Sequence, residues 1–252
     1  MMEGHFDLRC GLTGKPGRLV LLAAILAWLT GCARETAPEP IREWGQVEDF
    51  EQPLAVFEHV FWEPRDTTTT REFLRAEDLT GKRVMEIGTG SGLLSLCALQ
   101  AGAAQVVATD VNPHAVANAR YNAERLGLAA RFDVRQVAED AREAFVALRP
   151  GETFDLIVSN PPWEDANVGK IEDYALYDPG WLLLESLLDG LPERLAPDGR
   201  LWLAYGTRSG VLAVIRAANA RGFPVTMLEQ DQEVAALPNE FLPAVTLEIR
   251  LP

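Results

Sequence analysis

Short apolar runs alternate along most of the chain with segments whose apolar residues recur at helical spacing. Apolar, β-branched runs predict strands, and stripes with a period of 3.6 residues predict helices. We expect strands near 83–87, 105–110, 131–135, 154–159 and 200–205. We expect helices near 67–76, 92–101, 113–126, 141–148, 181–195 and 209–221. Regular alternation of this kind predicts an α/β fold built on a mostly parallel sheet.

The alternation changes after residue 221. Two strand-like runs, Val225–Leu228 and Val245–Leu251, follow one another without a helical pattern between them. Because no helix is available for a crossover, we expect these two strands to pair antiparallel.

A glycine-rich loop follows the first predicted strand. Gly88, Gly90 and Gly92 occupy every second position, and a helical run opens at Leu93. Glycines permit a tight turn and let backbone N–H groups approach a ligand at a helix amino terminus. The spacing departs from the dinucleotide fingerprint G-x-G-x-x-G, because the third glycine comes one residue earlier and Leu93 fills its place.

The second predicted strand ends in an acid, Asp110, which lies 22 positions after Gly88. An acid at this point can accept hydrogen bonds from the ribose hydroxyls of an adenosine ligand. A simple helix cap is the structural alternative for Asp110. The dipeptide Asn112-Pro113 already opens the next helix well, so ligand contact is the favoured interpretation.

The predicted strand 154–159 ends at the tetrapeptide Asn160-Pro161-Pro162-Trp163. Two prolines in series make the turn rigid and hold Asn160 at the carboxyl end of a strand, where open α/β sheets place their ligands. Asn160 Oδ1 and the Pro161 carbonyl can accept hydrogen bonds from a planar nitrogen nucleophile, and Trp163 can stack on it. Taken alone, the tetrapeptide is equally compatible with an ordinary strand-terminating turn.

In this order, Glu86-Ile87-Gly88-Thr89-Gly90-Ser91-Gly92, Asp110 and Asn160-Pro161-Pro162-Trp163 resemble class I S-adenosylmethionine-dependent methyltransferases. The likeness is greatest to the small-domain branch that contains release-factor glutamine and amino-group N-methyltransferases, and it covers about residues 57–252. It implies a Rossmann-like, mostly parallel seven-stranded sheet flanked by helices, with an antiparallel carboxyl-terminal hairpin. It also implies S-adenosylmethionine as cofactor and a nitrogen as methyl acceptor.

The resemblance assigns roles to individual residues. It implies that Asp110 holds the ribose, that Asn160 and the Pro161 carbonyl orient the nucleophile, and that Glu139 or Asp140 meets the adenine amino group. The residues that it places around the methionine part of the donor are Glu86, Gly88, Thr89, Gly90 and Gly92. The segment Pro64-Arg65-Asp66-Thr67 is similar to a short lead-in that covers the donor. The chain departs from the family at Trp163, where the glutamine-modifying members usually carry tyrosine, and this leaves the acceptor open.

Length and composition fit one catalytic domain. The chain has 252 residues, of which 48% are hydrophobic and 24% charged, and this is enough to bury a full core.

The amino terminus follows a different pattern. Three basic residues precede an apolar run of eleven residues at 19–29, which suits the core of a secretory signal but is too short to span a bilayer.

Immediately after this run, Leu29-Thr30-Gly31-Cys32 resembles a bacterial lipoprotein box, in which the cysteine is lipidated. We therefore expect a signal over 1–31, a tether over 32–56 that is rich in proline and charge, and a methyltransferase domain over 57–252. This organisation predicts a protein held at a membrane by a lipid on Cys32, with a cytoplasmic location as the alternative if the signal is not used. Cys97 then has no partner for a disulfide and is expected in the core.

The net charge of the chain limits the classes of molecule that are expected as methyl acceptor. The net charge is −14, and proteins that grip duplex DNA usually show a basic face to the phosphates. Only 89 residues follow Trp163, which is too few for a separate DNA-recognition region. A protein side chain or a small amine is therefore favoured over nucleic acid. The aromatic segment Tyr174–Pro179, with Trp181, is expected either to wall the acceptor pocket or to cover the core.

Other chemistries find little support in the sequence. His5, His59 and His114 are scattered, and no metal-ligand motif or nucleophile elbow is present. His59 is therefore expected to be structural. Two alternatives to an N-methyltransferase remain: a lipid-anchored binding protein that keeps the fold without catalysis, and a nicotinamide-dependent oxidoreductase. The glycine spacing and the Asn160–Trp163 turn disfavour the second.

Overall fold

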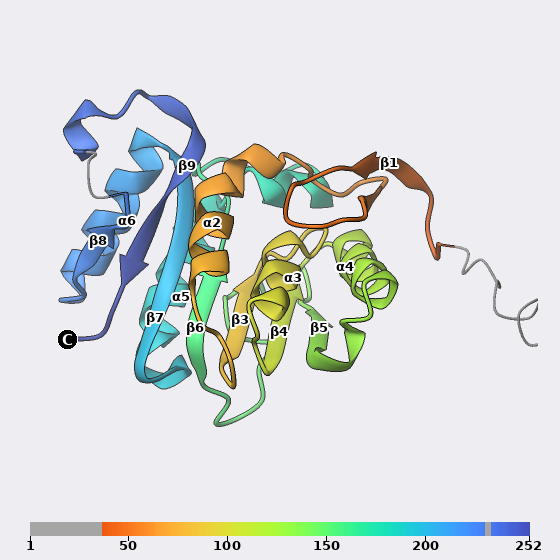
Figure 1. The fold of residues 1–252 in the computed structure, drawn as a ribbon. Helices are drawn as coiled ribbons and strands as arrows, with labels where there is room; N and C mark the ends of the chain where they lie inside the picture. Colours follow the sequence, from red (N-terminus) through yellow and green to blue (C-terminus); the bar gives the residue numbers. More distant parts are fainter. Residues whose placement is uncertain (1–36, 230–232) are drawn as a thin grey trace, which may run out of the picture. The chain divides into compact units, whose positions relative to one another are not determined.

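The structure, a computed structural model, describes residues 37–229 and 233–252. A seven-stranded sheet with the strand order β5-β4-β3-β6-β7-β9-β8 lies at its centre (Figure 1). The strands are β3 (Arg83–Ile87), β4 (Gln105–Asp110), β5 (Phe132–Gln136), β6 (Phe154–Ser159), β7 (Leu195–Thr207), β8 (Val225–Met227) and β9 (Glu240–Ile249). β3 to β7 pair in parallel, whereas β9 pairs antiparallel with both β7 and β8. The predicted mostly parallel sheet and the antiparallel terminal pair are confirmed.

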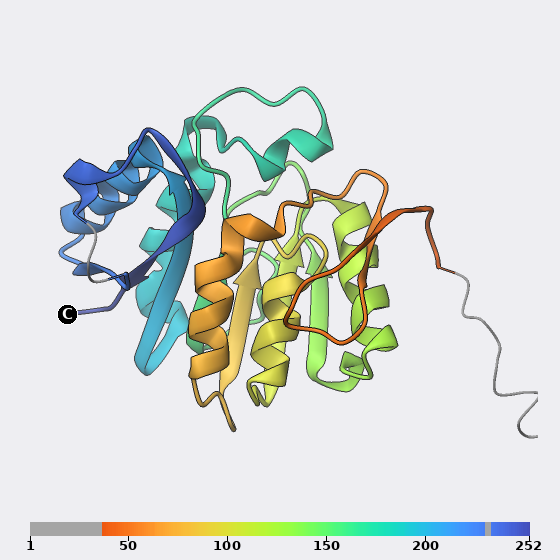
Figure 2. The same cartoon turned by 45° about the horizontal axis from the view of Figure 1, so that its top comes forward.

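Helices cover both faces of this sheet (Figures 1 and 2). They are α2 (Thr68–Ala76), α3 (Leu93–Gln100), α4 (Pro113–Arg125), α5 (Leu182–Arg194) and α6 (Arg208–Ala220). Alternate residues of each central strand enter opposite cores. Met85 and Ile157 pack with α5 and α6, whereas Val84 and Leu156 pack with α2 and α3. Burial on both faces explains why these strands are apolar throughout rather than alternating.

The prediction of a helix over 141–148 is wrong, because this segment forms successive turns. The Ala144 N–H donates to Ser186 Oγ on α5 at 3.0 Å, so a tertiary partner replaces the bond that an α-helix would make. The Leu148 N–H reaches back only three residues, to the Phe145 carbonyl at 3.0 Å. Local pattern could not reveal this competition.

The segment expected as a tether is packed onto the domain from Ile41 onward. β1 (Ile41–Gly45) and β2 (Leu54–Phe57) form an antiparallel pair, and every β2 side chain is buried. The Asn118 and Asn122 side chains on α4 bind this pair: Asn118 accepts from the Phe57 N–H at 2.9 Å and donates to the Ala55 carbonyl at 2.8 Å. Asp49, in the β1–β2 connection, is buried in an ion pair with Arg71 on α2. These contacts are long-range, which is why a sequence rich in proline and charge misled the prediction.

We predict that Asn118→Ala lowers the free energy of unfolding by about 1–3 kcal/mol, because it leaves the buried Phe57 N–H without its partner and removes one of the two hydrogen bonds to the Ala55 carbonyl. Urea denaturation measures this directly. Asn219→Ala is the matched control, since Asn219 is exposed on α6 and should change stability by less than about 0.5 kcal/mol. Equal stability of the Asn118 variant and the wild-type protein would contradict a tightly packed β1–β2 pair.

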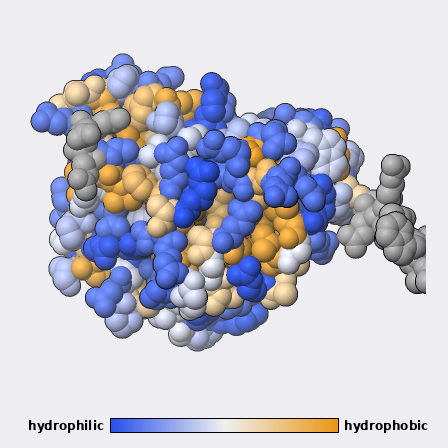
Figure 3. Space-filling view, in the orientation of Figure 1, coloured by the Kyte–Doolittle hydropathy of each residue, from blue (hydrophilic) through white to orange (hydrophobic). Residues whose placement is uncertain are grey.

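The predicted signal over 1–31 and the predicted lipidation site Cys32 lie outside the described residues. Within residues 37–229 and 233–252, no helix is long and apolar enough to cross a membrane. The face of the molecule in Figure 3 carries many hydrophilic side chains with hydrophobic ones between them. Cys97 is buried in α3 and forms no disulfide within the part of the chain that the structure describes.

Candidate active site

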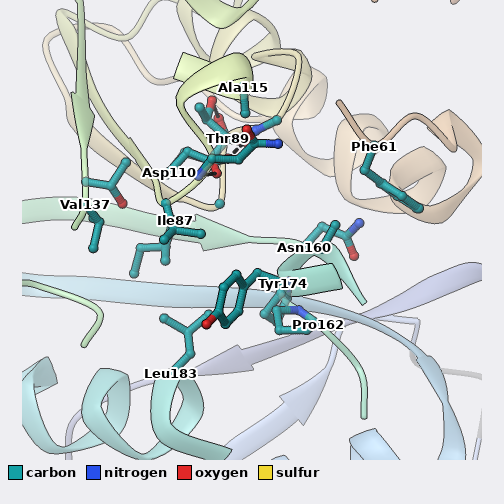
Figure 4. Close-up of a pocket in the computed structure, with 18 of the residues that line it drawn as sticks. Phe61, Ile87, Thr89, Asp110, Ala115, Val137, Asn160, Pro162, Tyr174 and Leu183 are labelled. Carbon is teal, nitrogen blue, oxygen red and sulfur yellow. Dashed lines mark hydrogen bonds between the residues drawn. The ribbon is translucent and has the colours of Figure 1, made fainter. Parts of the chain in front are cut away.

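A cavity lies where the carboxyl ends of β3, β4 and β6 meet, the position at which open α/β sheets bind ligands. Figure 4 shows Asp110 and Thr89 at one part of this cavity and Tyr174 and Pro162 at another. Of the residues predicted from the sequence, the cavity is lined by Glu86, Gly88, Thr89, Gly90, Asp110, Asn160 and Pro161. Three separate sequence motifs are therefore brought to one site.

The glycine loop between β3 and α3 owes its shape to positive φ angles, which are 74° at Gly88, 54° at Gly90 and 89° at Gly92. A Cβ atom at Gly88 or Gly90 would meet nothing within 4 Å, so these glycines serve backbone geometry and leave open space beside the loop. Gly92 differs, because it does not line the cavity. A Cβ there would lie 3.2 Å from Ala119 Cα, so Gly92 permits close packing of α3 on α4.

Glu86 is a buried acid at the end of β3, with a side chain that lines the cavity. Its Oε2 accepts hydrogen bonds from Thr89 Oγ1 at 2.6 Å, from the Ser95 N–H at 3.2 Å and from the Ser95 hydroxyl. Burial raises the pKa of Glu86 to about 8, although these hydrogen bonds oppose the rise. A cationic ligand group in the cavity would favour the ionised carboxylate.

Asp110 ends β4 and lies beneath the glycine loop. Its Oδ2 accepts from the Gly90 N–H at 2.9 Å, and its Oδ1 accepts from the Asn112 N–H at 2.8 Å. Burial raises the pKa of Asp110 to about 6, although these two backbone hydrogen bonds act to lower it. Asn112 caps α4 by accepting from the His114 N–H at 3.0 Å. Asp110 is therefore not needed as the cap of α4, and its carboxylate oxygens face the cavity rim and the loop.

Asn160 follows β6 directly and lines the cavity together with Pro161 and Pro162. The preceding residue fixes the strand end, because Ser159 Oγ donates to the Ile87 carbonyl on β3 at 2.7 Å. Trp163, expected to stack on the acceptor, does not line the cavity. Its ring packs against Gly206 of β7, and its Nε1–H donates to Asn160 Oδ1 at 3.2 Å and to the Ala204 carbonyl at 3.1 Å.

The two acids expected at the adenine are not brought into the cavity. Glu139 and Asp140 are exposed, and neither lines it. Glu139 instead accepts a hydrogen bond from the Tyr174 hydroxyl at 3.4 Å. Val137 lines this side of the cavity, and its N–H donates to the Asp110 carbonyl at 2.8 Å. The segment after β5 does bring an acid to the cavity, but this acid is Glu143 rather than Glu139 or Asp140.

Two further segments close the cavity. The lead-in before α2 contributes Phe61 and Pro64, and the connection between β6 and α5 contributes Tyr174 and Tyr177. The aromatic segment Tyr174–Pro179 thus lines the cavity, whereas Trp181 does not. His59, expected to be structural, also lines the cavity, and its Nδ1 lies 2.6 Å from Glu172 Oε1, which joins the two segments. No sequence pattern pointed to this pairing, since 113 positions separate the two residues.

Strand order, the antiparallel terminal pair and a glycine loop opening onto a cavity define a Rossmann-like methyltransferase fold. Residues 65–161 match the family described as ribosomal protein L11 methyltransferase (PrmA). The solved structure of a ribosomal protein L11 methylase from Lactobacillus delbrueckii superposes with a TM-score of 0.53 at 21% identity, covering 76% of this chain and 80% of that one. The fold is therefore shared with known methyltransferases.

Sequence relatives agree with this fold. A release factor glutamine methyltransferase from Bordetella pertussis is 39% identical over 152 residues, which make up 55% of this chain and 54% of that protein. A ribosomal protein L11 methyltransferase from Escherichia coli is 37% identical over 94 residues, or 37% of this chain and 29% of that protein. The chain thus spans about half or less of the length of these relatives. The chain therefore shares its fold, and the sequence of its central segment, with methyltransferases.

Proposed function

We propose that this domain transfers a methyl group from S-adenosylmethionine to a nitrogen atom of a protein side chain. The observation that carries the proposal is the meeting of the glycine loop, Asp110 and the Asn160–Pro162 turn in one cavity. The protein acceptor is supported by the relatives, whose names specify a release factor glutamine and ribosomal protein L11. The net charge of −14 also favours a protein over a nucleic acid.

The residues present fit the donor. Open space beside Gly88 and Gly90 would admit a ligand close to the backbone, and the carboxylate of Asp110 would accept hydrogen bonds from ribose hydroxyls. Glu86 would face the cationic methionine part. When bound, S-adenosylmethionine supplies an electrophilic methyl group on a sulfonium. Among the cavity-lining residues that follow β5 are the apolar Val137 and one acid, Glu143, and we assign the adenine contact on this side to Val137.

The chain itself acts mainly by orientation. Asn160 Oδ1 and the Pro161 carbonyl are acceptors held at a rigid turn, so they would bind the N–H groups of the acceptor and direct its lone pair into the cavity. Tyr174 and Phe61 would border the acceptor and help to exclude water. The nitrogen loses a proton on methylation, and this requires no strong base at the site.

Transfer of a tritiated methyl group tests the proposed function. The purified protein would be incubated with tritiated S-adenosylmethionine and, separately, a bacterial release factor and ribosomal protein L11. Label on a glutamine amide or on an amine of either protein supports the proposal. Label on neither protein, together with no binding of S-adenosylhomocysteine, would instead favour a protein that keeps the fold without catalysis.

Binding of the donor is predicted to release a proton from Glu86. In the protein without ligand, burial raises the pKa of Glu86 to about 8, and a cationic ligand beside the carboxyl group lowers this pKa. The affinity for S-adenosylmethionine should therefore rise with pH up to about pH 8 and become constant above it. The slope approaches about tenfold per pH unit at most. Calorimetry in buffers with different ionisation enthalpies measures the proton count between about pH 7 and 8.5, above the pKa of about 6 for Asp110.

Glu86→Gln is the control for this measurement. The amine of the ligand titrates with either protein, so the difference between the two proton counts belongs to Glu86. Identical counts for the wild-type protein and the Glu86→Gln variant would show that Glu86 does not respond to the donor.

We also propose that Cys32 carries a lipid that holds the domain at a membrane, on the basis of the lipoprotein-like sequence that precedes it. Mass spectrometry of the protein purified from its native membrane tests this. A diacylglyceryl group on an amino-terminal Cys32 supports the anchor, and an intact chain that retains residues 1–31 contradicts it.

A further inference from the structure

The environment of Trp163 suggests a role other than contact with the acceptor. Its ring occupies a slot on β7 that exists because residue 206 is glycine: a Cβ at Gly206 would lie 2.4 Å from Trp163 Cη2. The indole Nε1–H points back toward the turn and is shared between Asn160 Oδ1 at 3.2 Å and the Ala204 carbonyl at 3.1 Å. The Trp163 N–H thus hydrogen-bonds both the sheet, at the Ala204 carbonyl of β7, and the Asn160 side chain.

This contact fixes which way the Asn160 amide faces. An indole N–H can only donate, so the atom of the amide that faces it must be the oxygen. The amide nitrogen is then left to donate elsewhere. The side chain of Asp66, a buried acid of the lead-in, lies near the Asn160 amide: burial raises the pKa of Asp66 to about 6, and the Asn160 amide partly opposes this rise. The Trp163 N–H therefore sets the orientation of the amide, and an acid on the other side suits the NH₂ group that this orientation turns toward it.

The orientation matters for the chemistry at the turn. A carbonyl oxygen has two lone pairs, so Asn160 Oδ1 can accept from Trp163 and from one further N–H. A flipped amide would instead present an NH₂ group to the N–H of a methyl acceptor, and two donors cannot pair. Free rotation of the amide would populate this unproductive state.

We propose that Trp163 is a positioning residue that locks the Asn160 amide with Oδ1 as its presented acceptor, and that Gly206 makes room for the ring that does so. The effect of this orientation on methyl transfer rests on the proposed function, because it concerns how Asn160 binds an N–H group of the methyl acceptor. The structural part of the inference concerns only this chain and can be tested without an acceptor.

The test compares Trp163→Phe with Trp202→Phe. Phenylalanine fills much of the same slot but has no N–H to donate. Trp202 is the control, because its Nε1–H also donates to a side-chain oxygen, Glu248 Oε2 at 2.9 Å, but it neither lines the cavity nor hydrogen-bonds Asn160. Each variant loses an indole N–H donor, and the fully buried Trp202 should cost at least as much stability as the half-buried Trp163, so Trp202→Phe controls for a general loss of stability.

The first readout is the side-chain amide resonance pair of Asn160 in ¹H–¹⁵N spectra. We expect Trp163→Phe to shift or broaden this pair, with Trp202→Phe leaving it in place. Should Trp163→Phe fail to fold, the reciprocal measurement uses Asn160→Ala, which should shift the indole resonance of Trp163 and leave that of Trp202 unchanged. An Asn160 pair that is unchanged in Trp163→Phe, or a Trp163 indole that ignores Asn160→Ala, would overturn the inference.

The second readout is methyl transfer to whichever of release factor or ribosomal protein L11 the wild-type protein modifies. Loss of one neutral hydrogen bond should lower kcat by about 5- to 20-fold in Trp163→Phe, with the dissociation constant of S-adenosylhomocysteine unchanged within about twofold. Trp202→Phe should keep the wild-type kcat. A wild-type protein that modifies neither acceptor would count against the proposed function, while the resonance of Asn160 would still decide the inference. Equal kcat values for the two variants would contradict it.

Discussion

Asn160→Ala is expected to lower the rate of methyl transfer by about 10²-fold, because a misplaced nucleophile loses the advantage of proximity and alignment. The substitution removes the oxygen that, in our account, accepts an N–H of the acceptor nitrogen. The Pro161 carbonyl would remain, but one acceptor cannot fix the direction of a lone pair. Single-turnover transfer of tritiated methyl to the protein acceptor measures the effect.

The affinity for the donor separates this role from a general disruption of the cavity. Calorimetry with S-adenosylhomocysteine should give a dissociation constant for Asn160→Ala within about threefold of the wild-type value. Asn219→Ala, an exposed change on α6, provides a control that should alter neither quantity. A loss of donor affinity as large as the loss of rate would show that Asn160 holds the donor rather than the acceptor.

Asp110→Asn is expected to weaken binding of S-adenosylhomocysteine by about 10- to 100-fold. Hydrogen bonds to a charged group are worth about 1.5–3 kcal/mol, and each 1.4 kcal/mol changes affinity tenfold. Asparagine keeps the size of the side chain and one oxygen, which can still accept from the Gly90 or the Asn112 N–H. The substitution therefore removes the charge with less damage to the loop than alanine would cause.

Asp155→Asn is the matched control for Asp110. Asp155 also accepts from a backbone N–H, that of Arg83 at 2.8 Å, but it lies at the beginning of β6 and does not line the cavity. Its substitution should leave the dissociation constant unchanged. If both variants bound S-adenosylhomocysteine as tightly as the wild-type protein, Asp110 would have no part in holding the ribose.

Much of the fold could be predicted from the sequence, because the central strands are buried on both faces and therefore form unbroken apolar runs. β3, β4 and β6 begin and end where the pattern placed them. The packing of β1 and β2 could not be predicted in this way. It depends on Asn118 and Asn122, more than 60 positions away, and on an ion pair between Asp49 and Arg71.

The candidate site shows the same division. Glycine spacing and the ends of strands correctly indicated that Gly88, Asp110 and Asn160 would meet, because parallel strands share one carboxyl edge. The directions in which individual side chains point could not be predicted from the sequence. Trp163 turns into the slot beside Gly206, and Glu139 is exposed to solvent, so neither reaches the position expected for it.

The central claim is that the cavity binds an adenosyl methyl donor, and calorimetric titration of the full-length protein with S-adenosylhomocysteine tests it most directly. We predict saturable one-to-one binding that weakens in Asp110→Asn and persists in Asn160→Ala, with no binding of the reduced nicotinamide cofactor. No heat with S-adenosylhomocysteine, or saturable binding of the nicotinamide cofactor in its place, would contradict the account.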